Sequence, residues 1–592
     1  MRKKSFVLLV ISILLLSLFP STLFAQQDSS TFKNPVIWAD VPDPDVIRVG
    51  DTYYMSSTTM HMNPGVPIMK SKDLVNWEIV NYAYDVLEQG DKQALRNGQN
   101  EYGQGSWASS LRYHDGTFYL AFASFSAGKT YIYQTNDIEN GEWKRSELDG
   151  VYHDMSLLFD DDGHVYMVYG GTDIKVIELT ADATAIKEGG LDKTIISNAG
   201  QITGSEHIIN AEGAHIQKIN DKYYVHLITW PQGGGRTQLV YRADSIDGEY
   251  EGRIALDDSG IAQGQLVDTP DGKWYAFLFG DRGSVGRIPY LVPVTWEDDW
   301  PVFGVDGKVP EEMVIPVQGV NATSKIVASD EFNGSNLDLV WQWNHNPDNN
   351  YWSLTDRTGY LRLTNGRVST SILDTRNTLT QRTFGPESSG EIAIDVSNMK
   401  NGDVAGLSAF QENYGFVGVK VDGDSKSLVM VKGNSEAQEE VETIDLEQDR
   451  VYFKVDFDFK NQTDEANFYY SLNGVEWTAI GNTLQMEYTI PHFMGYRFAL
   501  FNYATSTTGG YVDFDYFRVD DKLTGSDEDG EDGEDGEDGE DGEDGHDGED
   551  GKDGQDRKDG QDGKDDQLGN GRNTSSDDNG DKKTSKDSYK YI

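Results

Sequence analysis

The chain has 592 residues, no cysteine and a formal net charge of −50 at pH 7. This length is sufficient for two or three domains with substantial cores, and the lack of cysteine excludes disulfide bonds. So strong a negative charge argues against nucleic acid as a partner and is compatible with a neutral polysaccharide.

The N-terminus has the pattern of a secretory signal peptide. The basic start MRKKS precedes the apolar run FVLLVISILLLSLF, which ends in small residues near Ala25. This run is too short and wrongly flanked for a stable membrane span. We therefore expect residues 1–25 to be removed, and the mature protein to be secreted, extracellular and without a membrane span.

Residues 34–320 contain five copies of one hairpin pattern. Each copy has an apolar strand start, a short turn rich in Asp, Asn and Gly, and a second strand with a tyrosine. The tyrosines are Tyr54, Tyr119, Tyr166, Tyr224 and Tyr275. Because the copies are about one propeller blade apart and long amphipathic helical patterns are absent, the sequence predicts an all-β, five-bladed β-propeller.

A second position repeats eleven or twelve residues before each tyrosine. It is occupied by Asp43, Trp107, Asp154, Glu212 and Gln263. Equivalent strand positions face the same way, so these side chains are expected to converge on the propeller axis. A single Asp would be explained by a turn or strand cap, but three carboxylates in register favour glycosidic bond cleavage, which needs an acid and a base or nucleophile. A third carboxylate nearby is expected to raise the pKa of the acid.

The sequence pattern changes at about residue 325. Alternating stretches such as GEIAIDVS and VYFKVDFDF continue to residue 520 and predict an antiparallel β-sandwich of jelly-roll character. Within it, the Asn473–Gly474 pair predicts a type I′ hairpin turn. Residues 526–592 are dominated by EDG, KDG and QDG triplets, and this low-complexity acidic tail is expected to be disordered.

Several motifs closely resemble glycoside hydrolase family 43. They are NPVIWADVPDPDVIRVGDTYYM, SKDLVNW, HDMSLLFDDDG, EGAHIQK and VDTPDGKWYAFLF, all within residues 34–320. The second unit resembles the β-sandwich that follows the propeller in many β-xylosidases of this family. The resemblance implies an inverting enzyme with Asp43 as general base, Glu212 as general acid and Asp154 as the residue that tunes and orients the acid.

The resemblance also implies residues that bind the sugar. Arg287 matches the family arginine of the innermost subsite, and Trp107 and His61 fall where the family walls the pocket. For Trp107 the alternative is core packing, and for His61 it is a loop hydrogen bond. Many members have a histidine in the fifth-blade segment that helps hold a central cation, often calcium. Here Ala262 and Gln263 stand in that segment, so Gln263 is expected to reach water or sugar, no cofactor is required, and structural calcium is left open.

The function expected is that of an exo-acting glycosidase. It would release pentoses from hemicellulose-derived oligosaccharides of xylan or arabinoxylan, as a β-xylosidase, an α-L-arabinofuranosidase or both. Two alternatives remain open. An endo-arabinanase would need an open groove across the propeller, and a non-catalytic carbohydrate-binding protein would show affinity without turnover.

Overall fold

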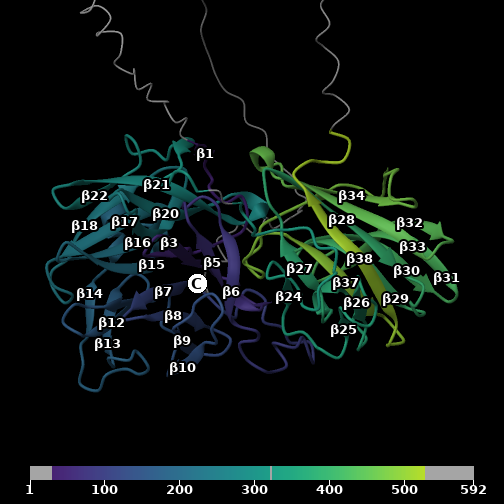
Figure 1. Ribbon diagram of the computed structural model, residues 1–592, viewed down its shortest axis with the longest axis horizontal. Coiled ribbons are helices and arrows are strands. Elements are labelled where there is room, and N and C mark those ends of the chain that lie inside the picture. Colours follow the sequence, from purple (N-terminus) through teal and green to yellow (C-terminus); the bar gives the residue numbers. More distant parts are fainter. Residues whose placement is uncertain (1–29, 321–322, 527–592) are drawn as a thin grey trace, which may run out of the picture. The chain divides into compact units, whose positions relative to one another are not determined.

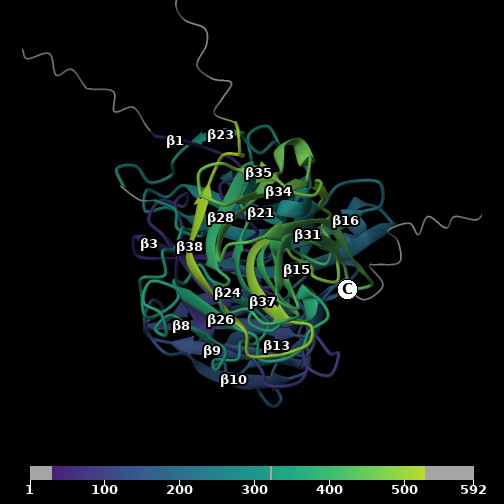
Figure 2. The same ribbon diagram turned by 90° about the vertical axis from the view of Figure 1, so that its right-hand side faces the viewer.

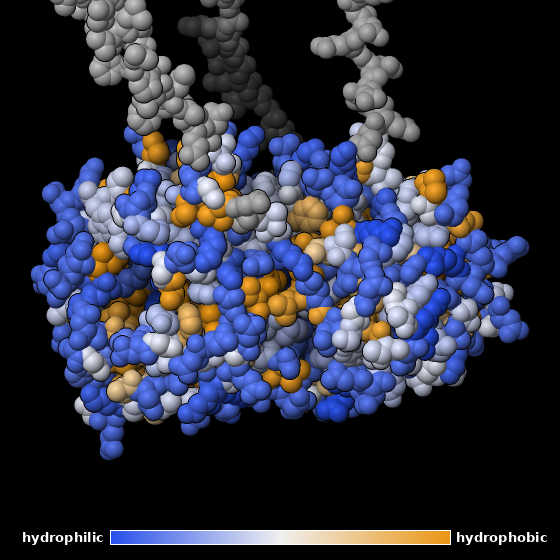
Figure 3. All heavy atoms as spheres, in the orientation of Figure 1, coloured by the Kyte–Doolittle hydropathy of each residue, from blue (hydrophilic) through white to orange (hydrophobic). Residues whose placement is uncertain are grey.

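The computed structural model describes residues 30–320 and 323–526 (Figure 1). The predicted signal peptide and the acidic tail beyond Ser526 lie outside these ranges. Among the described residues, no helix is both long and apolar enough to cross a membrane. Hydrophilic residues cover most of the face shown in Figure 3, as the composition leads one to expect.

Five four-stranded antiparallel sheets follow one another along the first part of the chain, coloured purple to teal in Figure 1. The first three blades comprise β2 (Asp45–Val49), β3 (Thr52–Ser56), β5 (Gly65–Ser71) and β6 (Glu78–Tyr84); β7 (Ser109–His114), β8 (Thr117–Ser124), β9 (Lys129–Thr135) and β10 (Lys144–Asp149); and β11 (Ser156–Phe159), β12 (Val165–Tyr169), β13 (Ile174–Leu179) and β14 (Asp192–Ile196). The last two comprise β15 (His207–Ile219), β16 (Lys222–Pro231), β17 (Thr237–Ala243) and β18 (Glu251–Leu256); and β19 (Ile261–Asp268), β20 (Trp274–Asp281), β21 (Arg287–Glu297) and β22 (Trp300–Phe303). The predicted five-bladed propeller is confirmed.

The first strand of each blade lies against that of the next. Strands β2, β7, β11, β15 and β19 make contact in this order, and β19 also contacts β2, which closes the ring. Side chains also join the two ends of the ring: Arg48 Nε of the first blade donates to Asp268 Oδ1 of the last at 2.9 Å. Asn34, in the segment before the first blade, donates from Nδ2 to the Leu291 carbonyl of the last blade at 2.9 Å. The five repeated tyrosines all lie on second strands and are buried, so the hairpin repeat is a repeat of blades.

Short elements lie before, between and within the sheets of the chain. They are β1 (Thr31–Lys33), which pairs with β23 (Glu312–Val314), and the 3₁₀ helices η1 (Ala199–Thr203), η2 (Gly283–Val285), η3 (Ile372–Asp374) and η4 (Lys460–Gln462).

The second unit is a sandwich of two antiparallel sheets, green to yellow in Figure 2. One sheet has the order β32 (Gln438–Leu446), β31 (Ser425–Gly433), β30 (Tyr414–Asp422), β29 (Asp403–Phe410), β37 (Arg497–Ala504), β27 (Leu379–Arg382), β24 (Gln342–Asn344) and β4 (Met62–Asn63). The other has the order β25 (Trp352–Ser353), β26 (Leu361–Thr364), β38 (Tyr511–Asp520), β28 (Glu387–Asp395), β33 (Arg450–Asp458), β34 (Glu465–Ser471) and β35 (Thr478–Ala479), with β36 (Leu484–Gln485) also paired to β34. The predicted β-sandwich is confirmed.

Alternating residues of the sandwich strands form its core. Phe453, Phe457, Phe498 and Phe514 are fully buried in one apolar cluster, and burial of each such ring contributes roughly 2–3 kcal/mol. The predicted type I′ turn at Asn473–Gly474 is wrong. Although β34 does form a hairpin with β35, Tyr470 pairs with Thr478 across a longer loop, and Gly474 has a positive φ of 76° whereas Asn473 does not.

Backbone and side-chain contacts join the propeller to the sandwich. Strand β4, which lies between the blade strands β3 and β5 in sequence, pairs with β24 at the edge of a sandwich sheet. The buried Asp40 carboxylate accepts hydrogen bonds from the Arg287 amide at 2.8 Å and the Gly495 amide at 3.0 Å. The Arg382 guanidinium donates to the backbone carbonyl of Asp40. The sandwich loop that contains Gly495 is therefore fixed to the strand that begins with Arg287.

Candidate active site

Irregular backbone in or just before the first strand of a blade places each of the three candidate carboxylates. Asp43 and Asp154 lie two residues before β2 and β11, and both have left-handed φ values, 51° and 47°. Glu212 lies inside β15, where the pairing with β16 shifts on both sides of it, and Gly213 follows with φ 68°. Such bulges and left-handed residues turn side chains out of the regular alternation of a strand.

Asp43 is held in a buried ion pair. Arg287 Nη1 donates to both of its carboxylate oxygens, at 3.0 and 3.1 Å, and Thr58 Oγ1 donates to Oδ2 at 2.6 Å. Asp43 and Arg287 are each only 4% exposed. Because burial makes an unpaired charge costly, the arginine is what allows a carboxylate to remain here.

Asp154 and Glu212 meet at a histidine that the sequence analysis did not single out. His153 Nε2 lies 3.3 Å from Glu212 Oε2 and 3.6 Å from Asp154 Oδ2. The Gly213 amide donates to Asp154 Oδ2 at 2.9 Å. Since Asp154 is left-handed, it and His153 lie on the same side, although neighbouring residues of a regular strand would face opposite ways.

The groups of this cluster shift one another's pKa values. Burial, with repulsion from Glu212 and Asp43, raises the pKa of Asp154 to about 6, although His153 opposes the rise. Burial acts to lower the pKa of His153, but Asp154 and Glu212 outweigh it and raise that pKa to about 9. For Glu212, burial raises the pKa, but the hydrogen bond and charge of His153 more than offset this, so its pKa is lowered. The expectation that carboxylate repulsion raises the pKa of the acid is therefore wrong for Glu212 in the free protein.

Aromatic side chains stand beside the charged groups. The Trp107 ring lies 4.7 Å from Phe125, 5.8 Å from His153 and 5.5 Å from Phe493 (centroid distances). Phe493 comes from the sandwich, and its ring centroid is 4.4 Å from the Arg287 guanidinium carbon. Among the described residues the buried Trp107 Nε1 has no hydrogen-bond partner, so the indole has an unused donor beside the site.

Gln263 and His61, the other two predicted site residues, lie in different surroundings. Gln263 has a left-handed φ of 57° and packs against Gly213. A Cβ added to Gly213 would lie 2.7 Å from the side-chain carbonyl carbon of Gln263. His61 is only 1% exposed and lies among the rings of Tyr102, His345 and His492. This surrounding favours ring packing over sugar contact for His61, and the roles predicted for both residues stay predictions.

Three neighbours of the site escaped the sequence analysis: His153, Arg236 and Phe493. The positive charge of Arg236 lowers the pKa of Glu212, while its Nε donates to Asp281 Oδ2 at 2.6 Å. The motif HDM contained a signal for His153, because a histidine directly beside a candidate carboxylate is a plausible proton partner. Arg236 and Phe493 lie outside the repeated position, so the repeat gave no indication of them.

The cluster does not have the character of a metal site. His153, Asp154 and Glu212 place one atom each within 4.8 Å of one another, and the imidazole nitrogen is hydrogen-bonded to Glu212. Calcium takes about six to eight oxygen ligands, whereas this group offers two carboxylates and an imidazole. On the axis, Asp45 accepts hydrogen bonds from Arg112 Nη1, the Leu111 amide and Gln265 Nε2, so an arginine already balances its charge. Neither donor set provides the oxygen ligands that calcium takes. The structural calcium that the sequence left open is not tested by these contacts.

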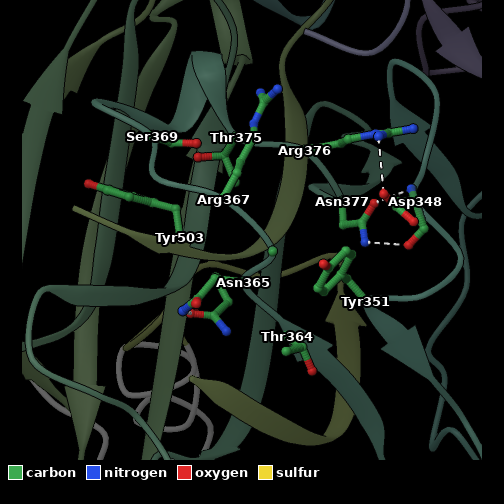
Figure 4. A pocket seen from close by; sticks show the side chains of 12 residues that line it. Asp348, Tyr351, Thr364, Asn365, Arg367, Ser369, Thr375, Arg376, Asn377 and Tyr503 are labelled. Atoms are coloured by element: carbon green, nitrogen blue, oxygen red, sulfur yellow. Dashed lines mark hydrogen bonds and ion pairs between the residues drawn. The ribbon is translucent and has the colours of Figure 1, made fainter. Parts of the chain in front are cut away.

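A separate polar cavity lies in the sandwich (Figure 4). It measures about 60 Å³ and is lined by residues that include Asp348, Tyr351, Arg376 and Asn377. Arg376 Nη1 donates to Asp348 Oδ2 at 3.2 Å, and the Asp348 amide donates to Asn377 Oδ1 at 2.7 Å. None of the site residues predicted from the sequence lines this cavity, so it is separate from the candidate active site.

Comparison with known sequences decides the family. Residues 32–301 match the glycosyl hydrolases family 43, and residues 329–520 match the β-xylosidase C-terminal concanavalin A-like domain. A β-xylosidase of Formosa agariphila is 30% identical over 84% of this chain and 91% of its own length. The chain belongs to glycoside hydrolase family 43. It is therefore a glycoside hydrolase of the xylosidase and arabinofuranosidase type.

Other relatives carry both kinds of name. A non-reducing end α-L-arabinofuranosidase of Bacteroides ovatus is 32% identical over 56% of this chain and 65% of its own. Among solved structures, a bifunctional GH43-CE protein of Bacteroides eggerthii is 56% identical, with a TM-score of 0.81 over 84% of this chain and 64% of that one. An engineered GH43 enzyme described as both endo-xylanase and exo-arabinofuranosidase is 31% identical, with a TM-score of 0.76 over 84% of this chain and all of its own.

Proposed function

We propose that this family 43 enzyme is a secreted, exo-acting and inverting glycosidase that releases pentoses from xylan- or arabinoxylan-derived oligosaccharides. The observation that carries the proposal is the meeting of three carboxylates from three blades around one site. Asp43 is paired with Arg287, and Glu212 and Asp154 both lie beside the imidazole of His153. Inverting hydrolysis needs an acid on one side of the bond and a base that activates water on the other.

Each carboxylate has a role that suits its surroundings. Asp43, paired with a buried arginine, is the general base that takes a proton from water as the water oxygen attacks the anomeric carbon. Glu212 is the general acid that protonates the leaving oxygen, and Asp154 orients it through the turn at Gly213. Asp43 does not join the close group of His153, Asp154 and Glu212, which is compatible with room for a water between base and acid.

The sandwich supports exo action. Phe493 reaches from the sandwich to Arg287 and Trp107 at the site. A ring in this position walls a pocket for a terminal sugar, whereas an endo-arabinanase would need a groove that a polymer can cross. Both β-xylosidases and an α-L-arabinofuranosidase are among the relatives, so either pentose is a candidate substrate.

An activity panel with site variants tests the proposal. The wild type is expected to release nitrophenol from a β-xyloside or an α-L-arabinofuranoside, and Glu212→Gln and Asp43→Asn to lose about a thousandfold in kcat/KM. Activity that survives Glu212→Gln undiminished would remove Glu212 as the acid. On linear arabinan, oligosaccharides that appear before any monosaccharide would favour the endo alternative, and sugar binding without turnover would favour a binding protein.

A further inference from the structure

The free site does not hold its proton where the reaction needs it. The proposed acid, Glu212, must carry a proton when it meets the leaving oxygen, yet its pKa is lowered in the free protein. The group beside it that keeps a proton is His153, whose Nε2 is 3.3 Å from Glu212 Oε2. A proton on Nε2 and a proton on Oε2 are therefore two arrangements of one hydrogen-bonded pair.

We propose that His153 is the positioning residue that stores the acid's proton and delivers it to Glu212. This inference rests on the proposed function of Glu212. In the free enzyme the imidazolium Nε2–H donates to the Glu212 carboxylate, and when the sugar binds the proton moves to Oε2, leaving a neutral imidazole and a carboxylic acid. Glu212 then gives this proton to the leaving oxygen, while Asp43 takes one from the attacking water.

The proton count closes over one turnover. The leaving alcohol gains the proton that began on His153, and the sugar gains the hydroxyl left by the water. Asp43 afterwards releases its proton to solvent, and the His153–Glu212 pair takes one up. No oxidant, metal or other reactant is needed.

The setting of the imidazole suits this task. Its side chain is 20% exposed, and it lies against the rings of Trp107 and Phe125, at 5.8 and 5.7 Å. Among the described residues Nδ1 has no partner, so the polar contacts of the ring are made through Nε2 alone. The rings fix the plane of the imidazole, and the carboxylates fix where its proton points.

In the free enzyme the charged groups around the pair keep its proton on His153 rather than on Glu212. Asp154 and Asp43 act on His153 from the turns before β11 and β2, and both favour its charged form. Arg236 and Arg287 act on Glu212 and favour its ionised form. A bound sugar excludes water, and because two separated charges are costly in a dry site, its binding favours the neutral pair over the ion pair.

The alkaline limb of the pH profile tests the inference, because kcat/KM reports the protonation of the free enzyme. With His153 in place the cluster keeps its last proton until the pH approaches 9. His153→Gln keeps a hydrogen bond without a titrating group, and His153→Phe keeps only the ring. Both are expected to move the alkaline limb of kcat/KM toward acid by about two pH units and to retain activity on the acid side.

A matched control removes a different histidine from the same blade. His164 Nδ1 lies 2.5 Å from Glu178, away from the site residues, so His164→Gln is expected to keep the wild-type pH profile. NMR of histidine-labelled protein gives a readout independent of turnover: one imidazole that stays charged to about pH 9 in the wild type and is absent from His153→Gln.

The outcomes separate the two proposals. If Glu212→Gln is inactive but the alkaline limb is unmoved in both His153 variants, the stored proton is wrong and the proposed function stands. If Glu212→Gln keeps the activity of the wild type, both fall. A uniform loss at every pH in the His153 variants, with an unmoved limb, would assign His153 a structural role only.

Discussion

The residues of the site are charged groups that are buried together, and each depends on a partner. Asp43 and Arg287 form a pair with little exposure, and Thr58 adds a third hydrogen bond. Removing one member of such a pair leaves the other charge buried and uncompensated, which costs more than the pair itself is worth. The site is therefore expected to be sensitive to single substitutions and tolerant of some paired ones.

Arg287→Met tests this dependence. We expect the free energy of unfolding to fall by about 3–5 kcal/mol, because the Asp43 carboxylate is left without its partner. Urea denaturation at pH 7 measures it. The double variant Asp43→Asn, Arg287→Met should recover most of the loss, and an unchanged stability in the single variant would contradict the account.

At the scale of elements, the site is made by irregularities in regular strands. Glu212 lies at a bulge of β15, and Gln263 lies where the pairing of β19 with β20 shifts. Gly213 serves both, because its left-handed backbone places Glu212 and its missing Cβ leaves room for the Gln263 side chain. A single glycine turn thus positions Glu212, the proposed acid.

Gly213→Ala is expected to reduce kcat by about ten- to a hundredfold while the protein remains folded. The added Cβ would lie 2.7 Å from Gln263, and a small displacement of a catalytic group is costly in rate. Gly233→Ala is the control, since Gly233 is also left-handed, with φ 82°, but has no atom within 4 Å of the added Cβ. Equal activity of the two variants would refute the positioning role of Gly213.

The repeated hairpins explain why much of this arrangement was predictable. The tyrosines Tyr54 to Tyr275 all pair across the first two strands of a blade, so the period of the sequence is the period of the fold. That regularity indicated the residues at the axis. It could not indicate His153, because only the left-handed backbone of Asp154 brings the His153 side chain to the same side of the chain as the Asp154 carboxylate. Nor could it indicate the turn after β34, where Ser471 and Asn473 accept hydrogen bonds from loop amides in place of a two-residue turn.

At the scale of the whole molecule, residues from the sandwich complete a site built on the propeller. Phe493 lies 281 residues after Glu212 and 339 after Asp154 in sequence, and only the fold places its ring beside Trp107 and Arg287. The loop around it is tied to the propeller by the Gly495 amide and Asp40. No periodicity relates such a contact to the propeller repeats, so it could not have been predicted from the sequence pattern.

Phe493→Ala is expected to widen the pocket. We predict that KM for a short aryl glycoside rises about tenfold through lost ring contact, and that longer products appear early from a xylo-oligosaccharide. Product analysis over time and initial-rate kinetics measure these effects. Tyr351→Ala, which changes an aromatic residue of the separate sandwich cavity, is the control and should behave as the wild type.

The contact between the two units contains histidines that are buried and neutral. Burial lowers the pKa of His492 to about 3 and also lowers the pKa values of His61 and His345, although Glu412 lies 3.4 Å from His492. The unfolded chain therefore binds more protons than the folded one between pH 6.5 and about 3, and stability is lost as the pH falls through this window.

His492→Phe keeps the ring that stacks on Tyr102 at 4.0 Å and removes the titrating group. We expect it to regain about 2–3 kcal/mol of unfolding free energy at pH 4.5 relative to the wild type, and to gain none of this at pH 8. Denaturation at the two pH values measures the difference. The same acid sensitivity in variant and wild type would show that His492 does not carry it.

Proton NMR of the first sugar released from an aryl pentoside tests most directly the claim that Asp43 and Glu212 act as base and acid around a water. We predict that the new anomer has the configuration opposite to that of the bond cleaved, before mutarotation mixes the two forms. A first product that keeps the original configuration would contradict it.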